Sequence, residues 1–103
     1  MVKLNETTFY EFINSSERVL VKIGAKWCSP CIGMEPALEA VSTKYPGLVG
    51  DVDIEESDNK TIATRFSIRN IPTTIVFQNG EVIERKIGPA REDILENMLT
   101  GQN

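Results

Sequence analysis

The feature that most constrains the fold of this chain is a pair of cysteines placed where a buried strand passes into a helix. Residues 19–25 form an apolar run whose single charged residue is Lys22, a pattern that predicts a buried strand. Cys28 and Cys31 follow this run, and Pro30 between them suits the first turn of a helix. Beyond the cysteines, apolar residues recur at helical spacing, at Met34, Leu38, Val41 and Tyr45. A buried strand that leads directly into a helix predicts an α/β fold.

The spacing of the two cysteines allows several kinds of chemistry. They are the only cysteines of the chain, and histidine is absent. A structural zinc ion takes four Cys or His ligands, so one chain cannot complete such a site, and a Cys–His catalytic pair is impossible. The interpretations that remain are two ordinary core cysteines, a redox-active dithiol, or a cluster to which two chains each contribute both cysteines. We expect the dithiol, with no metal and no cofactor.

The N-terminus of a helix is a favourable place for a reactive thiol. Unpaired backbone N–H groups and the positive end of the helix dipole stabilise a negative charge there, and this lowers the pKa of a thiol. The first cysteine of such a pair is usually the more exposed. We therefore predict that Cys28 is the nucleophile and that Cys31, one turn into the helix, resolves the mixed disulfide.

Length and charge restrict the class of protein. A chain of 103 residues predicts one domain over residues 1–103 that needs neither a metal nor a disulfide for stability. The net charge of −4, without a run of Lys or Arg, argues against a nucleic-acid partner. The first residues contain no apolar segment typical of a signal peptide, and no stretch approaches the roughly 20 apolar residues that span a bilayer. We expect a monomer in the cytoplasm, without a membrane partner. Structural disulfides are rare in that compartment.

Strand patterns predict a central sheet. One short strand ends at Leu4, and further strands are expected at residues 19–25, 48–54, 73–78 and 81–87. Asn79-Gly80 separates the last two and is a strong signal for a hairpin. Because helices alternate with strands before this hairpin, we predict a mixed sheet with helices on both faces.

Four helices are expected to cover this sheet. The second spans residues 29–45 and ends at Pro46-Gly47, and Ser57-Asp58 is the expected N-terminal cap of the third. The apolar faces of the other three are expected at Phe9, Phe12 and Ile13, at Ile62 and Phe66, and at Ile94, Leu95, Met98 and Leu99.

Taken together, these motifs resemble the thioredoxin family over essentially the whole chain. Cys28-Ser29-Pro30-Cys31 differs from the family's usual active-site tetrad only at its second residue, and Pro36 corresponds to the proline that kinks the active-site helix. Ile71-Pro72-Thr73 resembles the family's cis-proline loop, the segment 77–82 resembles its terminal hairpin, and Gly88 resembles the glycine beside its substrate groove. The resemblance implies a thioredoxin fold.

The resemblance also implies a thiol–disulfide oxidoreductase that reduces protein disulfides. Cys28 would attack the target disulfide, Cys31 would release the reduced product, and a disulfide reductase would restore the dithiol as electron donor. The absence of histidine between the cysteines favours a reductase over a more oxidising disulfide oxidase or isomerase. A thioredoxin-fold binding module with redox-inert cysteines is the alternative.

A substrate-binding rim around Cys28 follows from the same resemblance. Its expected residues are Trp27, Pro30, Ile71, Pro72 and Gly88. A cis bond before Pro72 would leave the neighbouring backbone free to pair with an extended substrate segment. Without the resemblance, Pro72 would be interpreted as an ordinary turn proline. Trp27 could also be a packing residue, but its position directly before Cys28 favours a surface role.

Two charged residues depart from the family's pattern. Lys22 stands where thioredoxins usually carry an acidic residue, and Asp51 stands where they usually carry a lysine. Strand alternation allows the two to face one another behind Cys31, as an exchanged ion pair; the alternative is an exposed lysine and a solvated aspartate. Because burial favours the neutral form of a lysine, Lys22 is predicted to take the proton of Cys31, with Asp51 as its partner. Gly24 replaces a bulky aromatic residue of many thioredoxins and leaves room beside the helix.

Overall fold

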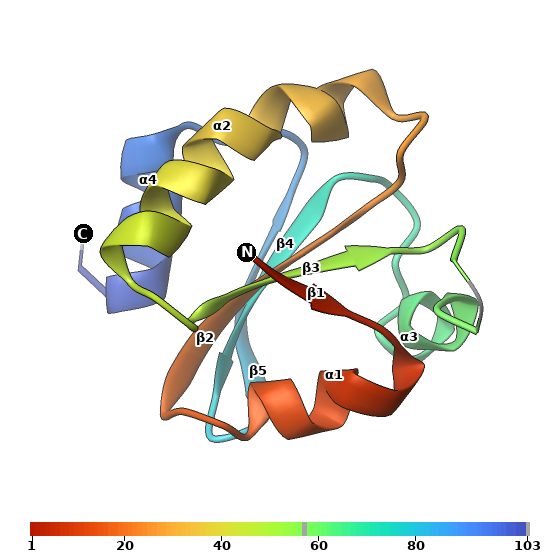
Figure 1. Ribbon diagram of the computed structural model, residues 1–103, viewed down its shortest axis with the longest axis horizontal. Helices are drawn as coiled ribbons and strands as arrows, with labels where there is room; N and C mark the ends of the chain where they lie inside the picture. The colour runs from red at the N-terminus through yellow and green to blue at the C-terminus, as the bar shows by residue number, and fades with distance from the viewer. Residues whose placement is uncertain (57, 103) are drawn as a thin grey trace.

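The computed structural model describes residues 1–56 and 58–102, and over these residues helices pack on both sides of a five-stranded sheet (Figure 1). The elements in chain order are β1 (Val2–Leu4), α1 (Glu6–Ile13), β2 (Arg18–Gly24), α2 (Ser29–Lys44), β3 (Val49–Asp53), α3 (Lys60–Arg65), β4 (Thr73–Gln78), β5 (Glu81–Ile87) and α4 (Glu92–Thr100). The predicted strands are confirmed, with bounds that differ by at most one residue at an end.

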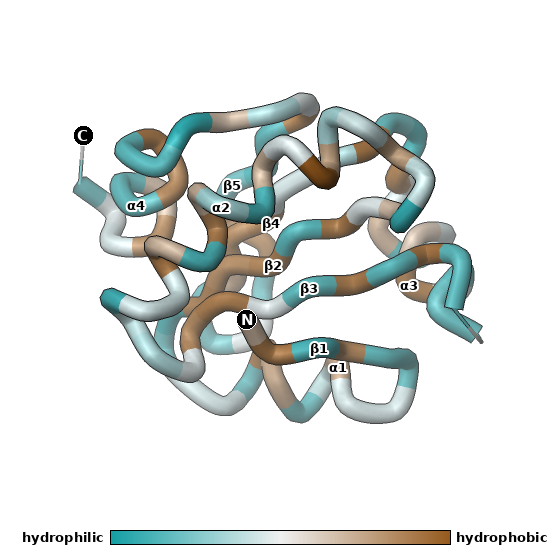
Figure 2. The backbone as a smooth tube through the Cα atoms, turned by 45° about the horizontal axis from the view of Figure 1, so that its top comes forward, coloured by the Kyte–Doolittle hydropathy of each residue, from teal (hydrophilic) through white to brown (hydrophobic). Residues whose placement is uncertain are grey.

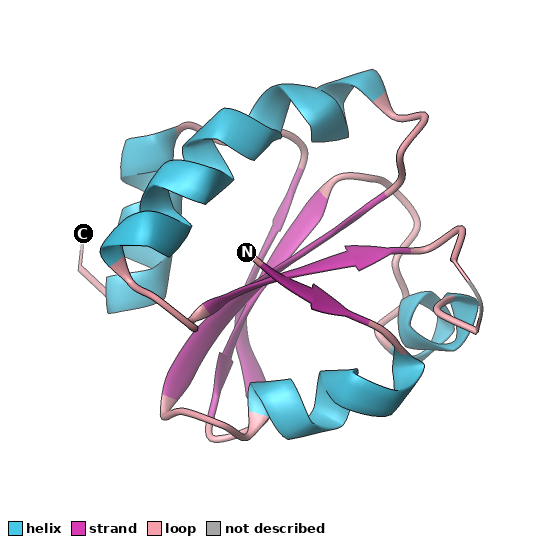
Figure 3. Cartoon of the chain, in the orientation of Figure 1, coloured by secondary structure: helices cyan, strands magenta, loops and turns pink. Residues whose placement is uncertain are grey.

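The sheet is mixed, as expected, with β2 at its centre. The strand order is β1-β3-β2-β4-β5 (Figure 2), and the helices lie on either side of these strands (Figure 3). β2 is parallel to β3 and antiparallel to β4, while β3 is parallel to β1, and β4 forms an antiparallel hairpin with β5. Asn79 and Gly80 both have positive φ at the hairpin turn, which suits Asn and Gly. The carboxyl end of β2 leads to the cysteines.

Each face of the sheet is covered by two helices. α1 and α3 lie on one face and α2 and α4 on the other (Figure 1). Alternate residues of β2 belong to the hydrophobic cores on opposite faces of the sheet. Val21 packs among residues of α1 and α3, and Leu20 packs among residues of α2 and α4. Hydrophobic residues gather in the middle strands, which are buried on both sides (Figure 2). This arrangement packs α2, which begins at the cysteines, against one face of the sheet.

Two details differ from the sequence-based expectations. The N-cap of α3 is Asn59, not Asp58, and Ser57 lies outside the described residues. The Asn59 side chain makes no cap hydrogen bond because it is buried, where it accepts from Glu6 N at 3.0 Å and donates to Asp53 O at 2.9 Å. On α4, Ile94 is exposed while the other three predicted apolar residues are buried.

Candidate active site

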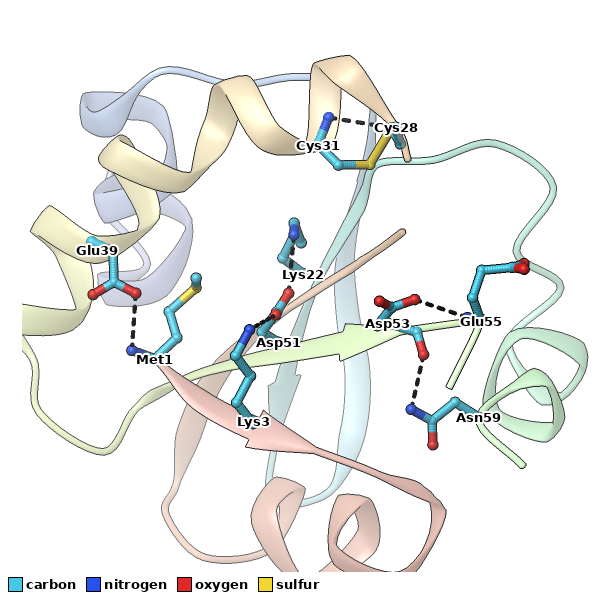
Figure 4. A network of polar contacts seen from close by, with 10 residues as sticks. All are labelled: Met1, Lys3, Lys22, Cys28, Cys31, Glu39, Asp51, Asp53, Glu55 and Asn59. Carbon is cyan, nitrogen blue, oxygen red and sulfur yellow. Dashed lines mark hydrogen bonds and ion pairs between the residues drawn. A yellow bond between two sulfur atoms is a disulfide. The ribbon is translucent and has the colours of Figure 1, made fainter. Parts of the chain in front are cut away.

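The two cysteines form a disulfide at the start of α2, with their Cα atoms 5.2 Å apart. Cys28 is the N-cap residue, and its Sγ accepts a hydrogen bond from Cys31 N at 3.2 Å (Figure 4). Backbone N–H groups in a first helical turn have no helical partner, so a sulfur at the N-cap provides one. The same N–H group and the helix dipole favour a thiolate on Cys28 once the disulfide is reduced.

Burial separates the two cysteines as expected. Cys28 retains 5% of its surface and Cys31 only 1%. Cys31 packs beneath Cys28 in a small apolar cluster with Ala25, against which Ile54 and Ile71 pack. A partner protein approaching from solvent therefore meets Cys28 first.

The loop before β4 lies beside Cys28. The Ile71–Pro72 peptide bond is cis, as predicted, and Cys28 Sγ lies 3.9 Å from the carbonyl oxygen of Ile71. The carbonyl of Pro72 accepts from Gly88 N at 2.8 Å, where a φ of +94° suits glycine. These contacts place Ile71 beside Cys28 and link Gly88 to the adjacent Pro72.

The remaining rim residues flank Cys28 along the chain. Trp27 is 67% exposed and Pro30 lies exposed in the first turn of α2. Ile87 was not predicted for this surface, yet it is 62% exposed and pairs with Thr73, directly after the cis-proline. Its outward direction depends on the hairpin register, which the sequence pattern of an edge strand does not reveal.

Lys22 and Asp51 meet behind Cys31, as the strand pattern suggested. They are neighbours in the β2–β3 register, and Lys22 Nζ donates to Asp51 Oδ1 at 3.0 Å. Their side chains are only 5% and 6% exposed, so the alternative of an exposed lysine and a solvated aspartate is wrong.

Gly24 allows this pair to approach the resolving cysteine. A Cβ atom at position 24 would lie 2.7 Å from Cys31 Sγ and 3.4 Å from Lys22 Cε. The sulfur and the lysine side chain therefore border the same space above β2 (Figure 4). The bulky aromatic residue found here in many thioredoxins would not fit this arrangement.

A third charged residue, Lys3, joins the pair from β1. Its Nζ donates to Asp51 Oδ2 at 3.1 Å, although the Lys3 side chain is 79% exposed (Figure 4). The hydrogen bond to Asp51 and the negative charge of that carboxylate raise the pKa of Lys3. Sequence reasoning missed Lys3, because nothing local relates it to a residue 48 positions away.

A small pocket of about 50 Å³ opens beside these charges. Among its lining residues are Lys3, Lys22, Gly24, Glu35, Asp51 and Asp53. Asp53 Oδ2 is buried without a protein hydrogen-bond partner among the described residues. The pocket is larger than one water molecule requires and has polar groups in its lining, so it can hold water beside the buried pair.

Two absences apply to the described part of the chain. It contains no group of three or more His, Cys, Asp or Glu side chains that could hold a metal ion. None of its helices is long and apolar enough to cross a membrane.

Known proteins resemble the chain in both sequence and structure. The thioredoxin of the red alga Porphyra purpurea is 38% identical over 89 residues, which are 86% of this chain and 83% of the relative. The thioredoxin of Buchnera aphidicola is 37% identical over 102 residues, covering 96% and 93%.

Solved thioredoxins have the same fold. A variant thioredoxin from Halobacterium salinarum superposes with a TM-score of 0.87 at 26% identity, over 97% of this chain and 88% of that one. Mitochondrial thioredoxin 3 from Saccharomyces cerevisiae gives 0.83 at 28% identity, over 98% and 94%. The family model for thioredoxin matches residues 1–101. With that match over nearly the whole sequence, and a dithiol pair at the end of the central strand, this chain belongs to the thioredoxin family of thiol–disulfide oxidoreductases.

Proposed function

We propose that Cys28 is the nucleophile and Cys31 the resolving thiol of this disulfide reductase. The observation that carries the assignment is the hydrogen bond from Cys31 N to Cys28 Sγ at 3.2 Å, because an N–H donor stabilises a thiolate on Cys28. The greater exposure of Cys28 supports the same assignment.

Two exchange steps then transfer two electrons to the target. The Cys28 thiolate attacks one sulfur of the target disulfide, so that a Cys28–target bond forms and the other target sulfur leaves as a thiolate. Cys31 loses its proton and attacks Cys28 Sγ, which releases the second target thiolate. The product on this chain is the Cys28–Cys31 disulfide seen in the structure, and a disulfide reductase returns it to the dithiol.

Substitution of each cysteine tests these roles. With a model protein disulfide as substrate, Cys31→Ser should accumulate a mixed disulfide through Cys28, detected as an increase in mass, whereas Cys28→Ser should accumulate none. The reverse result would exchange the two roles. A wild-type dithiol that leaves the model disulfide intact would favour the redox-inert binding module.

The rim residues are proposed to bind the target as an added strand. The carbonyl of Ile71 faces Cys28 Sγ at 3.9 Å, and no described residue accepts from the N–H group of Ile71. An extended target segment can use both main-chain groups, with Trp27, Pro30, Pro72 and Gly88 beside it. In the complex trapped by Cys31→Ser, the Ile71 amide should exchange its hydrogen more slowly than in the free protein. Equal exchange rates would contradict strand addition.

Lys22 is proposed as the base for Cys31, and Asp51 as the residue that positions it. The support is geometric: Lys22 Cε and Cys31 Sγ border the same space at Gly24, and Asp51 fixes Lys22 Nζ at 3.0 Å. In its neutral form, a buried lysine accepts the proton that the resolving thiol must lose.

The test is the pH dependence of mixed-disulfide decay. Lys22→Met should slow the decay near neutral pH and flatten its rise with pH. Lys44→Met is the matched control, because Lys44 forms an exposed ion pair at the other end of α2 and should leave the profile unchanged. Identical profiles for wild type and Lys22→Met would remove Lys22 from the mechanism.

The broader proposal is a single domain over residues 1–103 that acts as a cytoplasmic monomer. The one continuous sheet supports the single domain, and a reducing compartment suits a carrier that must return to the dithiol. A solved neighbour concerns thiol resolution in a yeast mitochondrial 1-Cys peroxiredoxin through the glutathione/thioredoxin systems, which supports proteins as targets. Sedimentation equilibrium tests the monomer, and a mass of two chains would contradict it.

A further inference from the structure

Polar residues form a continuous row across the sheet beneath α2. The strand registers align Lys3 of β1 with Asp51 of β3, Asp51 with Lys22 of β2, Lys22 with Thr74 of β4, and Thr74 with Lys86 of β5. Every strand thus contributes one polar residue to the same row. Directly opposed residues in a sheet are close enough for their side chains to interact, and on the β1 side ion pairs link Lys3 to Lys22 through Asp51.

One carboxylate in this row serves two lysines. Asp51 accepts from Lys22 through Oδ1 at 3.0 Å and from Lys3 through Oδ2 at 3.1 Å. Lys22 is buried and Lys3 is 79% exposed, so water can stabilise the charge of Lys3 but not that of Lys22. When both lysines are protonated, the three groups together carry one net positive charge, because Asp51 can neutralise only one of the two lysines.

We propose that Lys3 is a positioning residue for the resolving step: its charge neutralises Asp51 and thereby releases Lys22 to act as a neutral base toward Cys31. The inference rests on the role proposed above for Lys22. Without Lys3, the full negative charge of Asp51 would hold the proton on Lys22. With Lys3 in place, that attraction is shared, and the positive charge of Lys3 also opposes a positive charge on Lys22.

The other charged and titratable groups around Lys22 do not replace Lys3. Cys31 and Glu35 face this region from α2, Asp53 from β3, and Lys26 and Glu56 from the adjoining loops. Lys26 and Glu56 pair with each other at 3.1 Å, so their charges largely cancel. Glu35 and Asp53, when ionised, favour a protonated Lys22. Among the described residues, Lys3 is the one cation other than Lys22 that binds Asp51.

The protons balance through the resolving step. The Cys31 thiol gives its proton to the neutral amine of Lys22, and the resulting Cys31 thiolate attacks Cys28 Sγ. The Cys28–target bond breaks, and the target leaves as a thiolate. Lys22 then passes its proton to water in the adjoining pocket, which restores the neutral amine. The charge of Lys3 favours this last transfer because it repels the lysine ammonium.

The experiment measures decay of the Cys28 mixed disulfide in single turnovers from pH 5.5 to pH 9.5, followed by Trp27 fluorescence. Lys3→Met should move the midpoint of the rate profile upward by about half a unit to one unit, which corresponds to roughly three- to tenfold slower decay near pH 7. Lys3→Arg should restore the wild-type profile. Because Lys3 is exposed, high salt should reduce the difference between Lys3→Met and wild type.

The matched control is Lys86→Met, which removes the lysine at the opposite edge of the row. No described carboxylate pairs with Lys86, so its profile should coincide with that of wild type. If Lys3→Met also coincides with wild type while Lys22→Met flattens the profile, the inference about Lys3 is wrong and the role of Lys22 stands. If Lys22→Met leaves the rate profile unchanged, both the inference about Lys3 and the proposed role of Lys22 are wrong. Urea unfolding confirms that each variant is folded before it is compared.

Discussion

The two ends of α2 carry the same pair of chemical groups in opposite surroundings. Behind its first turn, Lys22 and Asp51 meet at 3.0 Å with side chains only 5% and 6% exposed. At its last turn, Lys44 and Glu96 meet at 2.6 Å with side chains 61% and 25% exposed, and Tyr45 Oη also donates to Glu96 at 2.7 Å. Both are lysine–carboxylate pairs within hydrogen-bond distance. Their surroundings, not their chemistry, make them different.

Burial changes how strongly an ion pair affects its surroundings. In the exposed cluster, water screens the charges, so the pair ties α4 to the end of α2 with little consequence for neighbours. In the buried pair, loss of water raises the cost of each charge and strengthens its effect on nearby groups. We therefore expect the buried pair to influence nearby groups more strongly than the exposed pair does.

The largest expected effect comes from breaking the buried pair on one side. Asp51→Asn keeps the shape of the side chain and removes its charge, so Lys22 in its protonated form is left buried without a counter-charge. Loss of one partner of a buried ion pair costs about 3–5 kcal/mol of unfolding free energy. Urea unfolding of the oxidised protein at pH 7 measures it.

Replacing both partners is the control for this prediction. In Lys22→Met with Asp51→Leu, apolar side chains occupy the same space and no charge is left buried. The double variant should recover most of the stability lost by Asp51→Asn. A double variant as unstable as the single one would show that the buried pair itself stabilises the fold.

A smaller effect is expected where the buried pair touches the active site. Gly24→Ala places a Cβ atom 2.7 Å from Cys31 Sγ, so the sulfur or the helix must shift. Overpacking of this kind costs about 1–3 kcal/mol, and mixed-disulfide decay should also slow. Gly33→Ala on α2 is the matched control, because no neighbouring atom lies within 4 Å of its added Cβ. Equal stability of the two alanine variants would contradict a close approach at Gly24.

The smallest effect is expected at the exposed cluster. Hydrogen bonds from Lys44 and Tyr45 lower the pKa of Glu96 below its ordinary value of 4.5. A carboxyl group whose pKa is lowered by folding stabilises the protein above its unfolded pKa, and this contribution is lost as the pH falls through the folded value. Glu96→Gln should therefore lower stability slightly at pH 7 and not in strong acid.

The salt dependence of stability distinguishes this exposed cluster from the buried pair. High salt at pH 7 should reduce the difference between wild type and Glu96→Gln, since the charges are exposed. The decay rate of the mixed disulfide should be the same in both proteins. A Glu96→Gln variant that changes this rate would show that the exposed cluster also acts on the active site.

Much of the fold follows from local patterns. The apolar run at residues 19–25 became β2, and Asn79-Gly80 formed the expected hairpin turn. These predictions succeed because hydrophobic periodicity and turn conformation depend on residues close in sequence. The N-cap of α3 was missed because the Asn59 side chain binds α1 and β3, which are distant in sequence.

Some features of the candidate site could likewise be predicted from residues close in sequence, and others could not. The C-x-x-C motif and its place before a helix could be recognised from adjacent residues, and the family resemblance supplied the cis-proline loop. Strand alternation also anticipated that Lys22 and Asp51 face one another. Lys3 could not be anticipated, because its contact with Asp51 depends on the register between β1 and β3.

Short-range patterns in the sequence are enough to predict the α/β class of this chain, the dithiol at the start of α2 and the opposite charges on neighbouring strands. The burial of Lys22 and Asp51, the contact of Lys3 with Asp51 and the close approach of Cys31 at Gly24 follow only from the folded structure. Parallel strands distant in sequence are aligned by packing of the whole sheet, and this packing determines which charged groups lose their contact with water.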